Sequence, residues 1–383
     1  MQKKIIALAV AGLASTAAFA QSNVTIYGVA DVGQAWVKSS DGAKGTNQST
    51  VSRLDSNSSY IGFKGAEALG NGLTAVFQFE TTVNADTGGF GGGRDTYAGL
   101  AGAFGTVAAG RLTHPLREMG VKVDILPGDA GIGTVNSVTG AINGIKTGAD
   151  ERASNAVAYI SPTFGGGFSV TAAYVNGEYR TSGADSVKAN AWQIAGKYDN
   201  GPLFVGLGYH KTKDSVRTGS ADVAPSGGGF FGTDQLTSSS MDARVWRLAA
   251  VYTAPFGTRF SALYDDTKVE NFPGAGGNDV KRAAWSLGAA HTFGANTVGL
   301  QYGRSGKTKV SGGASDLKDK ASIWTLGYQY ALSKRTMLQA RYSYLSNDKE
   351  GNFNFYNNPV KNGAATGNDA DYTGFMVGMR HTF

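Results

Sequence analysis

The sequence predicts an all-β chain that forms a closed antiparallel transmembrane β-barrel of about 16 strands. Three observations lead to this fold class. Apolar and polar residues alternate along most of the chain, short and long connections take turns between the alternating segments, and Tyr and Trp recur near segment ends. Because no linker or shift in composition divides the chain, we expect one folded domain.

Residues 1–20 have the pattern of a secretory signal peptide. Lys3 and Lys4 precede an apolar stretch, Ile5 to Ala14, and small residues form a cleavage site of the A-x-A type before position 21. The apolar stretch is shorter than the ~20 residues that a membrane-spanning helix needs. We therefore expect cleavage after Ala20, which leaves residues 21–383 as the barrel domain.

Composition argues against several classes of protein and of site. The chain has no Cys for a disulfide framework and no paired His at metal-ligand spacing, so we expect no metal and no cofactor. Of its 35 Lys and Arg, two lie in the signal peptide, so the remaining 33 face 29 Asp and Glu. This surplus of +4 is too small to indicate a nucleic-acid surface. It favours a mild preference for anions if the charges line a pore.

The segment from Leu73 to Glu80 shows the alternation of a half-buried strand. One face would suit lipid and the other water, with Leu73, Ala75, Phe77 and Phe79 on the first and Thr74, Val76, Gln78 and Glu80 on the second. The pattern recurs from Trp192 to Tyr198, around Trp246 and Trp324, and from Leu338 to Tyr344. A soluble β-sandwich would alternate as well, so the connections must decide between the two folds.

Connections alternate between tight turns and long polar loops. Asn71-Gly72 and Asn200-Gly201 mark tight turns, whereas Lys213 to Asp242 and Asn347 to Asp371 mark long loops. Short periplasmic turns and long external loops are typical of outer-membrane barrels. An aromatic girdle at the membrane interface would account for the tyrosines near strand ends on the apolar face: Tyr174, Tyr198, Tyr252, Tyr330 and Tyr344.

Four strings of sequence, taken in order, point to a family. They are NVTIYGVADVG from Asn23, SRLDSNSSYIGFKGAEALGNGLTAVFQFE from Ser52, YAGLAGAFGTVAAGR from Tyr97 and GMRHTF from Gly378. Together they resemble the trimeric general porins of Gram-negative bacteria, in particular the neisserial type. The resemblance implies a homotrimer in the bacterial outer membrane, with water-filled channels for passive diffusion of small hydrophilic solutes and ions. It also implies contacts with outer-membrane lipid, lipopolysaccharide and the outer-membrane assembly machinery.

The same resemblance implies an inward-folded third loop, which is the loop from Thr113 to Asp150. This loop follows the fifth strand and is similar to the family's constriction loop. Its internal acids Glu118, Asp124 and Asp129 would then face the pore. A long external loop is the alternative. A short second loop, Asn84 to Arg94, would latch onto a neighbouring subunit.

Opposite the constriction loop we expect a pore wall with four cations: Lys64, Arg111, Arg341 and Arg380. Alternation turns three of them toward the lumen, whereas Arg111 would point outward unless a bulge intervenes. Solvation of a strand end is the alternative role of each. The family often has a basic residue at three positions that are neutral in this chain, Tyr60, Thr74 and Ala158. We therefore expect only a weak anion preference.

The sequence ends on Phe383, which shares an apolar face with Phe375, Val377 and Met379. An aromatic residue at the end of the last strand resembles the family's assembly signal. An ordinary hydrophobic edge strand is the alternative.

Two other functions compete with a general porin. An enzyme would need a His or acid held in a pair by a third group, and no string suggests one. His291 and His381 have lipid-facing parity, and His210 lies at a strand end. Only His114 lies near the constriction loop, so we expect no enzyme. A substrate-specific outer-membrane channel would need aromatic residues along the lumen, and four aromatic residues keep that alternative open: Phe90, Phe230, Phe231 and Tyr356.

Overall fold

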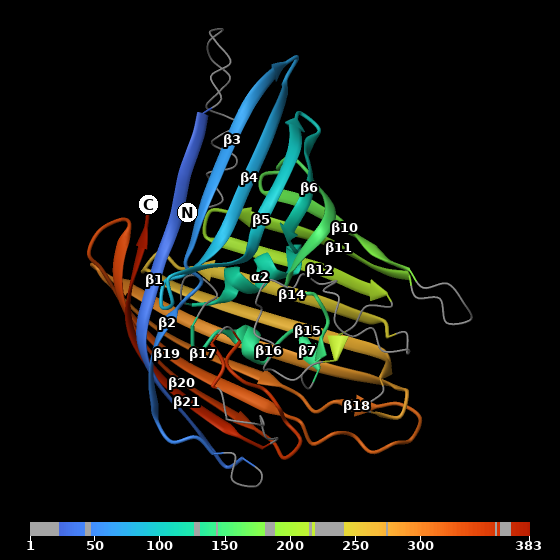
Figure 1. Ribbon diagram of the computed structural model, residues 1–383, viewed down its shortest axis with the longest axis vertical. Coiled ribbons are helices and arrows are strands. Elements are labelled where there is room, and N and C mark those ends of the chain that lie inside the picture. Colours follow the sequence, from blue (N-terminus) through green and yellow to red (C-terminus); the bar gives the residue numbers. More distant parts are fainter. Residues whose placement is uncertain are drawn as a thin grey trace.

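The structure of the chain is a computed structural model (Figure 1). It describes residues 23–42, 47–125, 131–142, 145–180, 188–213, 217–218, 241–272, 275–356, 358–360 and 369–383. The expected signal peptide, Asp129, Phe230 and Phe231 lie outside these residues. All strand pairs in the described ranges are antiparallel, and one sheet closes on itself into a barrel, which confirms the predicted fold class.

Sixteen strands form the wall of the barrel. They are β1 (Asn23–Ser40), β3 (Tyr60–Gly70), β4 (Leu73–Asn84), β5 (Gly89–Gly102), β6 (Gly105–Thr113), β9 (Arg152–Ile160), β10 (Phe168–Arg180), β11 (Lys188–Asn200), β12 (Leu203–Lys213), β14 (Ala243–Thr253), β15 (Thr258–Phe272), β16 (Asn278–Phe293), β17 (Asn296–Ser305), β19 (Ala321–Ala331), β20 (Thr336–Asn347) and β21 (Asp371–Thr382). Short strands β2 (Val51–Ser56) and β18 (Lys309–Val310) extend the sheet beside β1 and β16.

Strand β1 closes the barrel because it pairs along both of its edges. One edge pairs with β3 and then with β2, and the other pairs with β21 from Val29 to Ser40. Phe383, the residue after β21, exchanges two backbone hydrogen bonds of 3.1 Å with Gly28. The phenyl ring covers Gly28, where an added Cβ would lie 2.5 Å from Cζ of Phe383.

The two faces of the wall follow the predicted alternation. On β4, Leu73 and Phe79 are exposed on the outside, whereas Glu80 faces the lumen. There Glu80 accepts a 2.8 Å hydrogen bond from the hydroxyl of Tyr27, which reaches it from β1 across β3. Outward-facing aromatic rings also contact each other across strands. The ring centroid of Tyr209 lies 5.0 Å from that of Trp192 and 4.5 Å from that of Trp246.

Tight turns and long connections lie at opposite ends of the barrel. Asn71 and Gly72 join β3 to β4 with φ values of 51° and 75°, the left-handed conformation that a two-residue hairpin turn favours. At the other end β12 and β14 are separated by residues 214–242. We call this the long-loop end.

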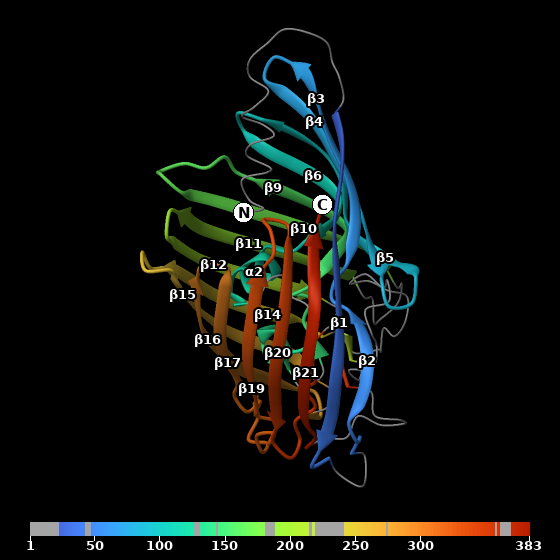
Figure 2. The same ribbon diagram turned by 90° about the vertical axis from the view of Figure 1, so that its left-hand side faces the viewer.

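The lumen contains two further small elements, helix α2 (Pro115–Val123) and the 3₁₀ turn η1 (Val135–Ser137). In both orientations α2 lies within the ring of strands (Figures 1 and 2). A separate small sheet joins β7 (Ala141–Ile142), β8 (Ile145–Lys146) and β13 (Arg217–Thr218). In the described part of the chain, no helix is long and apolar enough to cross a membrane.

Candidate functional site

Residues 114–151, between β6 and β9, are what we call the inner loop, and the part of it that the structure describes folds into the barrel. Its apolar side chains lie over glycines on the inward face of distant strands: Leu116 over Gly208 of β12, Ile125 over Gly288 of β16, and Ile132 over Gly374 of β21. A Cβ at these glycines would come within 2.6, 2.7 and 2.8 Å of the loop side chains. The loop therefore packs where the wall has no side chains. The inward-folded third loop is therefore confirmed, and the alternative of an external loop is wrong.

Helix α2 lies with one face against the wall and one toward the lumen. Pro115 begins the helix, where its missing N–H costs nothing. Leu116, Met119 and Val123 recur at helical spacing and are buried against β10 to β15. Glu118 is exposed on the opposite face. The helix therefore narrows the lumen from one side and presents polar side chains to it.

Arg247 of β14 ties both ends of the inner loop to the wall. Its Nε and Nη2 donate to the carboxylate of Asp265, its register partner on β15, at 2.7 and 2.6 Å. Its Nη2 also donates to Asp150 at 2.8 Å, and its Nη1 donates to Asp150 and, at 2.8 Å, to the carbonyl of Leu116. All three charged side chains are buried. This cluster was not predicted from the sequence, although the inward parity of Arg247 and Asp265 was a signal for it.

Two histidines bind the last part of the inner loop, at Thr147 and Gly148. Nδ1 of His114 and Nε2 of His210 each lie 2.8 Å from a carbonyl of that segment, those of Gly148 and Thr147. Carbonyls only accept, so both ring nitrogens donate. Gln193 accepts from the N–H of Leu116 at 3.1 Å and lies 2.9 Å from Nδ1 of His210. Its amide nitrogen then donates to that ring, which keeps His210 neutral.

His114 lies just before α2 and is fully enclosed. Burial lowers the pKa of His114 to about 4, and the neighbouring Arg111 and Arg117 act in the same direction. The hydrogen bond to the Gly148 carbonyl and the charge of Asp150 partly oppose this shift. His114 is therefore neutral at neutral pH.

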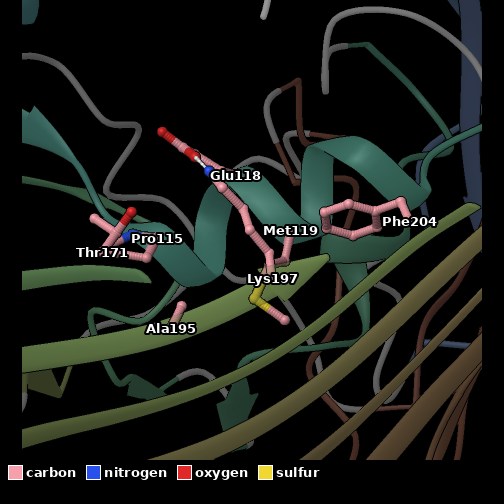
Figure 3. Close-up of a pocket in the computed structure, with 7 residues that line it drawn as sticks. All are labelled: Pro115, Glu118, Met119, Thr171, Ala195, Lys197 and Phe204. Atoms are coloured by element: carbon pink, nitrogen blue, oxygen red, sulfur yellow. Dashed lines mark ion pairs between the residues drawn. The ribbon is translucent and has the colours of Figure 1, made fainter. Parts of the chain in front are cut away.

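Figure 3 shows a small recess where α2 meets the wall. Its lining includes Pro115, Met119, Thr171, Ala195 and Phe204. At its edge Nζ of Lys197, on β11, lies 3.6 Å from Oε2 of Glu118. The side chain of Glu118 is 45% exposed, so this ion pair is in contact with water.

The three acids predicted to line the constriction differ in their surroundings. Glu118 is the one described member that faces the lumen. Asp124 is buried, and its Oδ1 accepts a 3.3 Å hydrogen bond from the N–H of Val135 within the inner loop. Its expected place on the pore surface is therefore wrong. Asp129 lies outside the described residues.

The four predicted wall cations also differ in their positions. Lys64 faces the lumen, with Nζ 4.7 Å from the ring centroid of Tyr27. Arg380 faces inward and pairs with Asp31. Arg341 is buried beneath the inner loop, where its Nη1 would lie 3.4 Å from a Cβ at Gly131, so it does not stand opposite that loop.

Arg111 has outward parity. It pairs in register with Thr96, and its guanidinium donates to the carbonyl of Gly93 at 2.7 Å and to the hydroxyl of Ser154 at 2.9 Å. The irregularity beyond Gly110 places its extra residue in β9 and leaves the parity of β6 unchanged. The expected lumen position of Arg111 is therefore wrong.

A second polar group lies on the inward face of β1, β3, β4 and β5. Arg94 pairs with Glu80 at 3.2 Å, and its guanidinium carbon lies 4.3 Å from the ring centroid of Tyr60. Glu80 also accepts from Tyr27. The inward face of Glu80 was predicted correctly from alternation, but parity alone did not bring Arg94 to it.

The connection between β20 and β21, residues 348–370, also packs inside the barrel in its described part. Phe353, Phe355 and Val360 are buried with Ile132 of the inner loop. Phe353 lies under Arg282 of β16, with 4.8 Å between the guanidinium carbon and the ring centroid. Among the described residues, no group of three or more His, Cys, Asp or Glu is placed to hold a metal ion.

Comparison with known proteins agrees with this architecture. The family model described as Gram-negative porin matches residues 7–352. Outer membrane porin protein 32 of Delftia acidovorans is 34% identical over all of both chains. Major outer membrane protein P.IB of Neisseria lactamica is 29% identical over 88% of this chain and 91% of its own.

Among solved structures, an anion-selective porin from Comamonas acidovorans superposes with a TM-score of 0.75. It is 29% identical in sequence, and the match covers 95% of this chain and 100% of the other. The closed barrel, its inner loop and these relatives agree: the chain belongs to the Gram-negative porin family and is a porin of the outer membrane.

Proposed function

We propose that the barrel is a general diffusion channel for small hydrophilic solutes and ions with a weak anion preference. The observation that carries this proposal is the inner loop, which occupies the lumen and presents Glu118 to it. The family assignment favours a channel over an enzyme. The anion-selective relative supports the direction of the charge preference.

The balance of inward charges supports a preference that is weak. Most inward cations in the described residues face a carboxylate, as Arg247, Arg380 and Lys197 do. Three others form no ion pair within the described residues, although each has a carboxylate at longer range. Lys64 and Arg282 lie over aromatic rings, and Arg259 donates to the carbonyls of Lys122 and Asp124. Cations outside ion pairs leave a small positive field in the lumen, and mobile ions screen that field poorly where the lumen is narrow.

Recording single channels in a salt gradient tests the proposal. We expect Lys64→Gln to shift the zero-current potential toward cations and Glu118→Gln to shift it toward anions. Excision of residues 125–139 should raise conductance and admit larger sugars, because the loop then no longer narrows the lumen. If conductance and both potentials stay at the wild-type values, the inner loop and Lys64 do not set permeation.

A homotrimer is supported by the outer face. Outward-facing Tyr or Trp side chains occur on strands from β9 to β20, including Tyr174, Trp246 and Trp324, whereas outward positions of β3 to β6 in the described residues carry none. A sector without the aromatic girdle fits a protein contact better than lipid. At the β4–β5 turn, within the predicted latch, Phe90 is 74% exposed.

Light scattering in detergent tests the trimer with a matched pair of variants. Phe90→Asp should lower the molar mass from three chains toward one, because it removes the exposed ring from the subunit contact. Phe256→Asp is the control, since Phe256 is 67% exposed in the turn between β14 and β15. Equal masses for both variants would argue against the latch.

A substrate-specific channel is the second candidate, and three inward tyrosines favour it. Tyr27, Tyr60 and Tyr97 lie on β1, β3 and β5, and the rings of Tyr27 and Tyr60 are 6.2 Å apart. Aromatic faces of this kind can bind sugar rings. A conductance that a sugar blocks with saturation would identify a specific channel, whereas a conductance that only scales with bulk salt identifies a general one.

We also propose that residues 1–20 are removed on export and that Phe383 is read by the outer-membrane assembly machinery. The pairing of Phe383 with Gly28 supports a role for this residue in the final strand contact.

A further inference from the structure

Five basic residues form a straight row across the outside of the barrel. Strand pairing places each directly beside the next: Lys211 of β12, Arg244 of β14, Lys268 of β15, Lys281 of β16 and Lys309 of β18. Each alternates with inward-facing neighbours, so all five point outward. We call these residues the outer basic row.

Such a row is unfavourable by itself. Neighbouring strands are ~4.8 Å apart, and like charges directly opposite each other destabilise a sheet. Nearby acids relieve part of this repulsion. Lys211 lies 3.9 Å from Asp242, Lys268 lies 2.9 Å from Glu270 and 2.7 Å from Asp279, and Lys281 lies 3.2 Å from Asp266.

Two members of the row have an acid only at longer range: Arg244 interacts with Asp279, and Lys309 interacts with Asp316. Within the described residues, Arg244 and Lys309 form no ion pair, and both are exposed. Lys281 keeps 57% of its side chain exposed beside its acid. The row therefore offers positive charge to an external anion.

The aromatic residues beside the row fix its level in the membrane. Trp192 is the register partner of Lys211 on β11, and Tyr209 and Trp246 lie one outward position below Lys211 and Arg244. The rings of these three residues are in contact. Trp and Tyr belts lie at the level of lipid headgroups, so the cations reach the phosphate layer.

The position along the barrel identifies the leaflet. Lys211 is near the end of β12 and Arg244 near the start of β14, on either side of the long connection of residues 214–242. Long connections of outer-membrane barrels are external. The phosphates at that surface belong to the glycolipid of the outer leaflet, lipopolysaccharide.

We propose that the outer basic row binds the phosphate groups of lipopolysaccharide, with Arg244, Lys281 and Lys309 as its main contacts. Guanidinium and ammonium groups are the usual protein ligands of phosphate. Bound phosphate would also relieve the repulsion within the row. The inference rests on the outer-membrane location but not on the selectivity of the channel.

The test compares binding of diphosphoryl lipid A, fully dephosphorylated lipid A and inorganic phosphate to the delipidated, folded barrel in detergent. A triple variant, Arg244→Gln with Lys281→Gln and Lys309→Gln, removes charge from exposed positions. A matched control, Lys334→Gln with Arg335→Gln, removes exposed charge from the turn between β19 and β20 at the other end of the barrel.

Wild type and control should bind diphosphoryl lipid A with equal affinity, and the triple variant should lose at least about tenfold. Dephosphorylated lipid A should bind all three proteins weakly and alike. Equal affinity of wild type and triple variant for diphosphoryl lipid A would overturn the proposal. Inorganic phosphate that binds the wild type as tightly as the lipid would overturn the assignment to a lipid. Because the triple variant should keep wild-type conductance, this test is independent of the channel proposal.

Discussion

Arg380 of β21 and Asp31 of β1 are register partners across the seam that closes the barrel, and Nη1 of the arginine lies 2.9 Å from Oδ2 of the carboxylate. Asp31 also accepts a 2.6 Å hydrogen bond from Gln339 of β20. Both members of the ion pair are buried. A cation expected to set selectivity is therefore also part of the contact between the last strand and the first.

Arg380→Gln should lower the free energy of unfolding by about 3–5 kcal/mol, because it leaves the buried carboxylate of Asp31 without its partner. The double variant Asp31→Asn with Arg380→Gln should recover part of this loss, since no unpaired charge remains. Lys64→Gln should cost little. Urea unfolding in lipid vesicles measures all three, and equal stability of Arg380→Gln and Lys64→Gln would contradict the role of the seam.

Deletion of Phe383 should lower the amount of assembled barrel in the outer membrane while export to the periplasm stays normal. The deletion removes two backbone hydrogen bonds to Gly28 and the ring that covers it. Phe383→Ala keeps the backbone bonds and separates the two contributions. Fractionation of cells measures the outcome, and equal outer-membrane levels of truncated and full-length protein would rule out an assembly role.

The barrel could be predicted from the sequence because alternation with period two is a local signal. Lipid-facing positions such as Leu73 and Phe79 were assigned correctly for this reason. The site is non-local, and parity states only which face a side chain takes. It could not show that Asp150, from the end of the inner loop, would reach Arg247. It could not show that Asp124 turns into the loop instead of the lumen.

Leu326→Arg should destabilise the barrel by about 2–4 kcal/mol, because it places a charge in hydrocarbon near mid-depth. Leu326 faces outward on β19 and is 51% exposed. Gln329 has inward parity on the same strand, so Gln329→Arg should be mild. Denaturant unfolding in lipid compares the two variants, and similar costs would mean that the faces of β19 are exchanged.

Stability should fall on acidification between about pH 6.5 and pH 4, in part because of His114. In the folded barrel burial lowers the pKa of His114 to about 4, so the unfolded chain binds the proton first as the pH falls. The stabilisation is complete above about pH 6.5 and is lost toward pH 4, by about 3 kcal/mol. Asp150, Arg111, Arg117 and His210 are the titratable or charged groups around the ring.

Urea midpoints measured from pH 7.5 to 4.5 test this pH dependence. His114→Asn should flatten the profile, because the variant cannot take up the proton. His291→Asn is the matched control, since His291 is exposed on the outer face of β16. A slope that His114→Asn leaves unchanged would assign the acid sensitivity to other groups.

Arg247 should be the residue whose loss most affects the inner loop, because its charged guanidinium contacts the start of the loop at Leu116, its end at Asp150 and the wall at Asp265. Arg247→Gln leaves two buried carboxylates facing each other and should lower the free energy of unfolding by about 3–5 kcal/mol. With its ties lost, the inner loop should move within the lumen, so single-channel records should show frequent closures. Asp265→Asn weakens the contact of Arg247 with the wall and also the 3.1 Å hydrogen bond that Asp265 accepts from the N–H of Gly140 in the inner loop. Asp150→Asn weakens the contact of Arg247 with the end of the loop and leaves its contact with the Leu116 carbonyl. If loop release causes the closures, Asp150→Asn should reproduce them more fully than Asp265→Asn does. If Arg247→Gln channels show wild-type conductance without frequent closures, the contacts of Arg247 are not needed to hold the inner loop.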